Sequence, residues 1–389
     1  MNRFWLVGDL LFPEGHIAPG ALLIDGNRIG AVSSAPAADG LPVIQQPDGA
    51  VLLPGFIDLQ INGGWGHDFT QEPESVLVVA EHLPATGVTA FLPTVVTASW
   101  ERYPAILANL NATIAESWKR TDVARPLGGH IEGPFLSPRK PGAHNPTHLR
   151  LPTVADAQAL LQAGSVKLLT LAPELDGALE VISALSAAGI VVSAGHSMAT
   201  WEQAQAGFAA GIRYGTHLFN AMPPLHHRDP GLVGALLNRA DVPVGLMLDG
   251  VHIHPEVVRM VYRLKGAAGI TLITDAIAAL GMPPGRYQLS DRTIIVNRTS
   301  ARLSDGTLAG SIMTMDQAVR NMVAFTGCSL AEAAIMAAQT PARLLRIEDR
   351  QGVLRPGADA DIVVLDAHLE VWMTLIGGQI VYAQQRPAL

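Results

Sequence analysis

The chain has 389 residues and a mass of 41.0 kDa, of which 49% are hydrophobic and 15% are charged. This composition is typical of a globular protein and excludes a disordered chain. The formal net charge is −8, without a block of like charges, and no apolar run approaches membrane-spanning length, so we expect neither a nucleic-acid nor a membrane partner.

The cysteine content and the N-terminus bear on the compartment. Cys328 is the only cysteine, so no disulfide can form within the chain, which fits a reducing environment. The apolar stretch at the N-terminus is interrupted by Asp9, too early for a signal peptide. We therefore expect a cytoplasmic protein.

Both ends of the chain have the pattern of short β-strands separated by turns. Near the start, Asp25-Gly26-Asn27 separates two apolar runs, which is typical of a hairpin. Near the end, Gly377-Gly378 separates two further apolar runs. We predict that residues 1–53 and 355–389 form one small β-sandwich domain.

The middle of the chain alternates apolar runs with helical segments. Buried parallel strands have near-continuous apolar sequences, and eight strand–helix units make a (β/α)8 barrel. We therefore predict an α/β protein with a TIM barrel over residues 54–354. The eight predicted strands are 51–61, 88–95, 128–134, 166–173, 190–196, 213–219, 242–252 and 270–276.

The segments between and after these strands give more specific signals. Thr200-Trp-Glu-Gln203 has the spacing of a capping box, so a helix should begin there. After the eighth strand, residues 293–311 are predicted to form a hairpin that turns at Asp305-Gly306. Two helices, over 314–325 and 330–345, should follow it.

Polar residues end several of the predicted strands, where barrel enzymes carry their chemistry. Glu132, His196 and His217 end the third, fifth and sixth strands. Imidazole and carboxylate are zinc ligands, and three of them leave a fourth position open for water. Each residue alone is more often structural, but together they predict a catalytic site for one zinc per chain, with Fe²⁺ or another divalent ion as an alternative.

Asp275 ends the eighth strand. Aspartate after a strand is often a helix N-cap, yet its place opposite the metal set favours a general base.

Several motifs resemble one family closely. They are His130-Ile-Glu-Gly-Pro-Phe135, Gly142-Ala-His-Asn-Pro146, Ala194-Gly-His-Ser197, Gly215-Thr-His-Leu-Phe-Asn-Ala-Met-Pro223, Asp249-Gly-Val-His252 and Ile273-Thr-Asp-Ala276. Over nearly the whole chain the sequence resembles the N-acetylglucosamine-6-phosphate deacetylases of the amidohydrolase superfamily. The resemblance implies a hydrolase of a linear amide C–N bond that converts N-acetyl-D-glucosamine 6-phosphate to D-glucosamine 6-phosphate and acetate in amino-sugar catabolism.

The resemblance also implies roles for individual residues. It assigns the metal to Glu132, His196 and His217, and catalysis to Asp275 and His252. It implies a homodimer, in which Arg228 serves its own site or that of the neighbouring subunit. The substrate contacts implied in this way are Ala143, His144, Asn220, Ala221, Arg228, Asp249, His252, Leu308, Ala309 and Gly310.

The first strand departs from the wider superfamily. Metal-dependent amidohydrolases typically carry a His-x-His pair there, whereas this chain has Gln60 and Asn62. Because an amide is a poor ligand beside imidazole, we expect no second metal, with Gln60 and Asn62 near the single one. Asp58 is expected to brace the barrel end.

Other functions stay open from the sequence. The galactosamine epimer of the substrate is an alternative, because no motif is specific for the C4 hydroxyl. A dihydroorotase-like enzyme would need the His-x-His pair and a bridging lysine. A sugar-phosphate sensor without catalysis would have lost metal ligands or Asp275, and all four residues are present.

Overall fold

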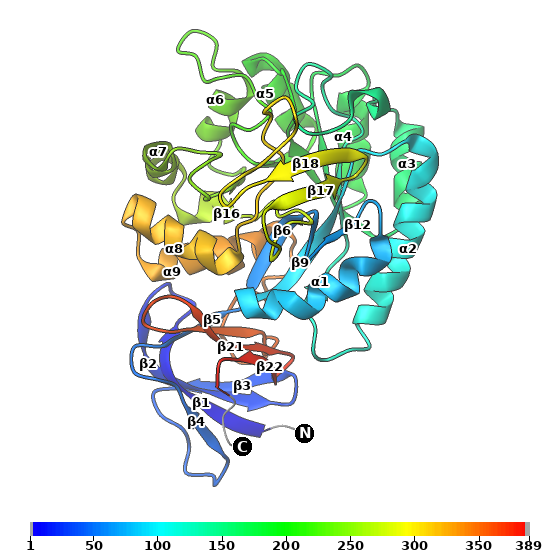
Figure 1. Cartoon of the computed structure of the whole chain (residues 1–389). Coiled ribbons are helices and arrows are strands. Elements are labelled where there is room, and N and C mark those ends of the chain that lie inside the picture. Colours follow the sequence, from blue (N-terminus) through cyan, green and yellow to red (C-terminus); the bar gives the residue numbers. More distant parts are fainter. Residues whose placement is uncertain (1–2, 386–389) are drawn as a thin grey trace.

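The computed structural model describes residues 3–385, which form a barrel and a smaller β unit (Figure 1). The barrel strands are all parallel to their neighbours and almost entirely buried, as their apolar sequences require. In order around the barrel they are β6 (Phe56–Ile61), β9 (Val88–Val96), β11 (Gly129–Glu132), β12 (Val166–Leu171), β13 (Val191–Ala194), β14 (Ile212–Gly215), β15 (Val244–Leu246) and β16 (Ile270–Leu272).

The barrel closes between its first and last strands. Ile61 forms a parallel bridge with Ala276, and Asn62 N donates a 2.7 Å hydrogen bond to the Ala276 carbonyl. Asp275 N donates to the Gln60 carbonyl at 2.8 Å. The predicted (β/α)8 fold is thereby confirmed. We call this contact between the first and last strands the seam; it places residues 60–62 beside residues 275–276.

Helices cover the outside of the barrel (Figure 1). The predicted capping box is present: the Thr200 hydroxyl accepts from Gln203 N, and the Gln203 side chain accepts from Thr200 N. The helices are α1 (Val76–His82), α2 (Tyr103–Ser117), α3 (Val154–Ala163), α4 (Ala178–Ala187), α5 (Trp201–Ala210), α6 (Gly231–Asn238), α7 (Pro255–Lys265) and α8 (Met315–Thr326).

The second of the two predicted final helices is one continuous helical segment with an irregular middle. It consists of α9 (Leu330–Ala334), the π-helical turn η6 (Ile335–Gln339) and α10 (Thr340–Leu344). Short elements complete the barrel: the 3₁₀ turns η1 (Pro73–Ser75), η2 (Leu83–Thr86), η3 (Trp100–Arg102), η4 (Pro146–His148) and η5 (Ala267–Gly269), and the strands β7 (Gly63–Gly64), β8 (His67–Asp68) and β10 (Arg125–Pro126).

The two ends of the chain share one sheet, whose strand order is β22-β21-β20-β5-β1-β2-β3 with β4 beside β1. Its apolar side chains enclose a separate core that includes Leu22, Leu52, Ile362 and Met373. The boundaries 1–53 and 355–389 remain our prediction for this unit. Its strands are β1 (Arg3–Leu11), β2 (Ile17–Asp25), β3 (Arg28–Ser33), β4 (Val43–Gln45), β5 (Val51–Pro54), β20 (Ile362–Leu365), β21 (Val371–Ile376) and β22 (Gln379–Ala383).

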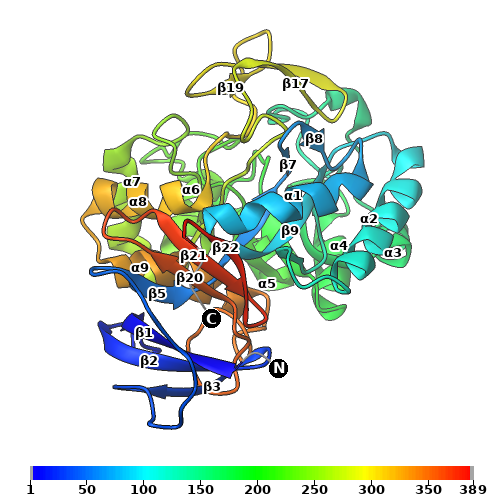
Figure 2. The same ribbon diagram turned by 60° about the horizontal axis from the view of Figure 1, so that its bottom comes forward.

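A three-stranded antiparallel sheet, drawn in yellow at the top of Figure 2, projects from the barrel on the side away from the terminal β unit. It contains β17 (Gly285–Leu289), β18 (Arg292–Val296) and β19 (Ala301–Arg302). The predicted turn at Asp305-Gly306 is present, since Gly306 N donates to the Leu303 carbonyl at 3.0 Å. The prediction missed β17, which pairs with β18 along its whole length.

No helix within residues 3–385 is both long enough and apolar enough to cross a lipid bilayer.

Candidate active site

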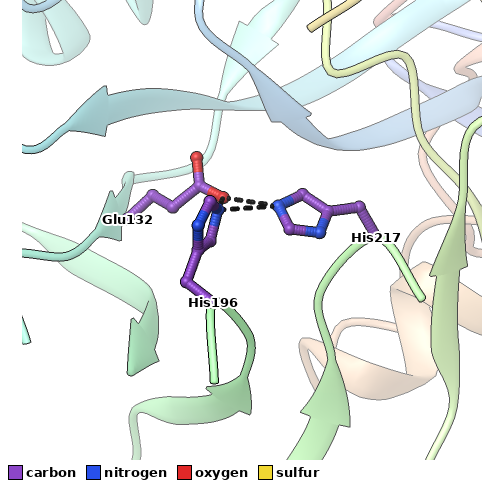
Figure 3. Close-up of side chains that lie close together, drawn as sticks. All are labelled: Glu132, His196 and His217. Carbon is purple, nitrogen blue, oxygen red and sulfur yellow. Dashed lines mark hydrogen bonds and ion pairs between the residues drawn. The ribbon is translucent and has the colours of Figure 1, made fainter. Parts of the chain in front are cut away.

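Three side chains from different strand ends converge in the barrel (Figure 3). Glu132 is the last residue of β11, His196 lies two residues beyond β13, and His217 two beyond β14. Glu132 Oε1 lies 3.2 Å from His196 Nε2 and 3.0 Å from His217 Nε2, and the two Nε2 atoms lie 3.0 Å apart. All three side chains are buried.

These distances fit a single metal ion. Ligands about 2.0–2.1 Å from a tetrahedral zinc lie about 3.3 Å from each other, close to the spacing here. The tautomer of His196 also fits, because its Nδ1–H donates to the Lys140 carbonyl at 3.0 Å and leaves the Nε2 lone pair available. Two imidazole nitrogens and a carboxylate oxygen form a donor set suited to zinc or iron.

The backbone is strained where the site residues leave their strands. His196, His217 and Asp275 have φ values of 49°, 26° and 48°, in the left-handed region that non-glycine residues seldom adopt. Such conformations cost about 1–3 kcal/mol each and cluster at functional sites. All three residues line the same pocket.

Burial and charge set the ionisation of the site. Burial opposes the charge on Glu132, but contacts with His144, His196 and His217 hold its pKa well below the usual range. Burial and the neighbouring His144 lower the pKa of His196 to about 4, so this imidazole is neutral at pH 7. A carboxylate and a neutral imidazole are the forms that bind a cation.

Asp275 lies beside the metal set and is held by the first strand. Asn62 Nδ2 donates to Asp275 Oδ1 at 2.7 Å, and within residues 3–385 the other oxygen has no hydrogen-bond partner. Burial, followed by the charge of Glu132, raises the pKa of Asp275 to about 6. A carboxyl group with a pKa near neutrality suits a general base that later acts as an acid.

The other first-strand residues support this arrangement. Gln60 Nε2 donates to Glu132 Oε1 at 3.0 Å, whereas Gln60 Oε1 is buried without a partner in the described chain. Asp58 accepts from the Thr274 hydroxyl at 2.5 Å and from Thr274 N at 3.3 Å. Asp58 therefore ties the first strand to the segment that carries Asp275, as the expected brace would.

Two further histidines have one nitrogen fixed by the protein. Thr97 N donates to His144 Nδ1 at 3.2 Å, which places the proton of a neutral ring on Nε2, 3.7 Å from Glu132 Oε2. His252 Nδ1 donates to Asp249 Oδ2 at 2.7 Å, while Asp249 Oδ1 accepts from His252 N at 3.0 Å. Asp249 thus orients His252 instead of facing the ligand space.

Most of the predicted site residues line one pocket of about 380 Å³. Among the predicted site residues, its walls contain Asn62, Glu132, Ala143, His144, His196, His217, Asn220, Ala221, His252, Asp275, Leu308 and Gly310.

Four predicted residues lie outside its lining. Gln60 and Asp249 bond to Glu132 and His252, Ala309 is buried in a small apolar core with residues of β17, β18 and β19, and Arg228 is exposed on the loop after β14. The roles predicted for these four stay predictions.

Sequence reasoning missed several residues of the site. Thr97 orients His144, and the Lys140 carbonyl orients His196. Arg139 and Lys140 also line the pocket, as does Leu289 from the missed strand β17. The sequence position of Arg139 and Lys140 could have indicated that they belong to the site, because they lie between the motifs that contain Glu132 and His144. The contacts of Thr97 and Leu289 join segments distant in sequence, so no local pattern could reveal them.

A closed (β/α)8 barrel with a buried carboxylate–imidazole set and an adjacent aspartate defines a metal-dependent hydrolase. The profile of the amidohydrolase family matches residues 51–381, and the chain belongs to this family. Within it, the chain belongs to the N-acetylglucosamine-6-phosphate deacetylases.

Named relatives support this placement. The chain is 43% identical over 349 residues to N-acetylglucosamine-6-phosphate deacetylase of Bos taurus, covering 86% of this chain and 84% of that protein. The enzyme of the same name from Bacillus subtilis (strain 168) is 36% identical over 375 residues, with 94% and 93% covered.

A solved structure agrees in fold. It is a mutant N-acetyl-D-glucosamine-6-phosphate deacetylase from Mycobacterium smegmatis in complex with N-acetyl-D-glucosamine-6-phosphate. Its TM-score to this chain is 0.90 at 35% identity, and the match covers 98% of this chain and all of that one (100%).

Proposed function

We propose that this enzyme hydrolyses the acetamide of N-acetyl-D-glucosamine 6-phosphate, releasing acetate and D-glucosamine 6-phosphate. The observation that supports it most is the meeting of Glu132, His196 and His217 with Asp275 in one pocket. Membership of the deacetylase family supports the amino-sugar substrate.

The metal belongs to Glu132, His196 and His217, and we propose one Zn²⁺ per chain. When bound, zinc supplies Lewis acidity, which lowers the pKa of water and polarises a carbonyl. Glu132 provides the negative charge, and His196 keeps Nε2 unprotonated through its Nδ1–H bond to Lys140. Gln60 donates to Glu132 and holds that carboxylate in place.

Asp275 moves the protons of the reaction. Its carboxylate accepts a proton from the attacking water as the water oxygen bonds to the acetyl carbon. The same carboxyl then donates that proton to the sugar nitrogen as the C–N bond breaks, which gives an amine and acetic acid; the acid's remaining proton passes to the amine or to solvent and leaves acetate. Asn62 fixes Oδ1, so Oδ2 carries the proton between the two positions.

His252 and His144 position the substrate. His252 turns Nε2 into the pocket while Nδ1 is paired with the Asp249 carboxylate, and we assign the doubly protonated ring, whose Nε2–H can donate, to the acetyl oxygen. With Nδ1 bonded to Thr97, His144 presents Nε2–H, suited to a sugar hydroxyl. Both rings are held by the protein before the substrate arrives, which reduces the entropy lost on binding.

We assign the phosphate to the loop after β14. Phe219 and Ala221 have φ values of 76° and 51°, a backbone form that can turn amide N–H groups toward an anion. Asn220 and Ala221 line the pocket, whereas Arg228 is exposed and its NH1 lies 2.8 Å from His227 Nε2.

Arg228 therefore fits the neighbouring subunit of a homodimer better than its own site. The homodimer and a cytoplasmic location are further parts of the proposal. Sedimentation of the protein tests for the dimer. Mixing Arg228→Ala and Asp275→Asn subunits tests the shared site, because mixed dimers should regain activity. A monomer with full activity would contradict it.

Acetate release tests the proposed reaction. The substrates are N-acetylglucosamine 6-phosphate, its galactosamine epimer and unphosphorylated N-acetylglucosamine, with metal content measured on the same sample. We expect turnover to favour the phosphorylated glucosamine, with about one zinc per chain. If the protein bound zinc but turned over none of the three, the substrate assignment would be wrong and the metal-site assignment would stand.

A further inference from the structure

A second pocket, of about 450 Å³, lies at the opposite end of the barrel from the active site. Val191 begins β13, Arg213 is the second residue of β14, and Pro243 directly precedes β15; all three line it. Its other wall comes from α10 and the residues after it, including Arg343 and Arg346. We call this space the basal pocket.

The basal pocket carries excess positive charge. Arg213, Arg343 and Arg346 line it, and within residues 3–385 none of them forms an ion pair. The single carboxylate in its described lining is Asp241, whose two oxygens accept from Arg239 Nε at 2.8 Å and Arg239 NH2 at 2.7 Å. Asp241 is thereby paired with Arg239, and although its charge also acts on Arg213, no carboxylate of the described lining forms an ion pair with any of the three guanidinium groups.

One of the three guanidinium groups is held in position by the backbone. Arg213 NH1 donates to the carbonyls of Ile212 at 2.9 Å and Phe208 at 3.2 Å. These bonds occupy NH1 and leave Nε and NH2 for another acceptor. A guanidinium fixed in this way loses less side-chain entropy when it binds an anion.

We propose that the basal pocket binds a phosphate monoester. Guanidinium groups match the tetrahedral oxygens of phosphate through paired N–H bonds. The volume is in the range of small-molecule sites, of roughly 300–1,000 Å³, so the pocket has room for the organic part of the ligand as well as the phosphate. The proposal does not depend on the reaction at the other end of the barrel.

Protection of individual arginines against phenylglyoxal, followed by mass spectrometry, tests the site directly. Inorganic phosphate should slow the modification of Arg213, Arg343 and Arg346. Arg263, exposed on α7 without an ion pair in the described chain, is the internal control. Equal rates with and without phosphate at all three pocket arginines would overturn the proposal.

Calorimetric titration provides the second test. Glucosamine 6-phosphate, inorganic phosphate and unphosphorylated glucosamine separate the contributions of the phosphate and the sugar. The double variant Arg343→Ala/Arg346→Ala should bind the phosphorylated ligands at the basal pocket at least about tenfold more weakly, with Arg263→Ala as the matched control.

Acetate release measured on the same samples shows that the double variant is folded, since none of the substituted residues belongs to the active site. Unchanged stoichiometry and affinity in the double variant would reject the site, whatever the outcome for the catalytic reaction.

Discussion

Asn62 and Asp275 meet across the seam of the barrel, where Asn62 Nδ2 donates a 2.7 Å hydrogen bond to Asp275 Oδ1. One residue follows the first barrel strand and the other follows the last, 213 positions apart. The bond stabilises the ionised carboxylate, whereas burial and Glu132 oppose it. The closure of the barrel therefore directly affects the pKa of the proposed base.

Replacing Asn62 with Leu keeps the side-chain size and removes the donor. The pKa of Asp275 should then rise further, because the ionised form loses a stabilising contact. Asp275 must be ionised to act as the base. The acidic limb of the plot of kcat against pH should therefore move to higher pH by roughly one to two units. The profile is measured with metal content matched to the unsubstituted enzyme. An unmoved limb would show that the bond does not tune the base.

Replacing Asp275 with Asn should leave the metal set intact but remove the proton carrier. We expect kcat to fall by about 10²–10⁴-fold while zinc content stays unchanged. Asp349→Asn, at a carboxylate whose side chain is 96% exposed, is the matched control and should keep full activity. Near-normal turnover by the Asp275 variant would exclude the proposed role.

Removal of the metal should destabilise the protein as well as inactivate it. Glu132, His196 and His217 bring a buried charge and close ligand atoms together, which a bound cation offsets. A ligand at about 1,000 times its Kd stabilises by about 4 kcal/mol, so chelation should lower Tm measurably. Added Zn²⁺ should restore both Tm and activity, and Mg²⁺ should restore neither. If Tm and turnover both survived complete chelation, the metal assignment would be wrong.

Asp361, between β20 and the barrel, should make folding stability depend on pH. Burial raises its pKa to about 6, against an ordinary value of 3.8. The folded chain holds this proton more tightly than the unfolded one. The protonated Asp361 therefore contributes fully to the free energy of unfolding below pH of about 4, and this contribution is lost as pH rises through about 6. The loss amounts to about 3 kcal/mol.

The variant Asp361→Asn isolates this effect, because an amide does not titrate. Gly377 N donates to Asp361 Oδ1 at 2.7 Å, a bond that the Asn oxygen can replace, and Gln351 Oε1 nearby lacks a partner in the described chain. The free energy of unfolding is measured with denaturant at pH 4 and at pH 7. Between these two pH values the variant should gain about 3 kcal/mol in that free energy relative to the unsubstituted chain. An equal difference at both pH values would contradict the raised pKa.

Much of the fold follows from local sequence patterns. The apolar runs predicted the eight barrel strands, because a strand buried on both faces needs apolar side chains at successive positions. The first predicted strand was wrong at its start, since residues 51–54 form β5 of the terminal sheet and the barrel strand begins at Phe56. The strand β17 escaped prediction because its first four residues alternate between half-buried and exposed, with no apolar run before the buried Leu289, and it forms by pairing with β18.

The sequence by itself determined which residues end the barrel strands and therefore which could bind a metal or transfer protons, since parallel strands all point their C-terminal ends the same way. Only the tertiary structure decided which atoms do so. The Lys140 carbonyl selects the tautomer of His196, Thr97 selects that of His144, and barrel closure brings Asn62 to Asp275. These contacts depend on packing between segments far apart in the chain, which local periodicity does not encode.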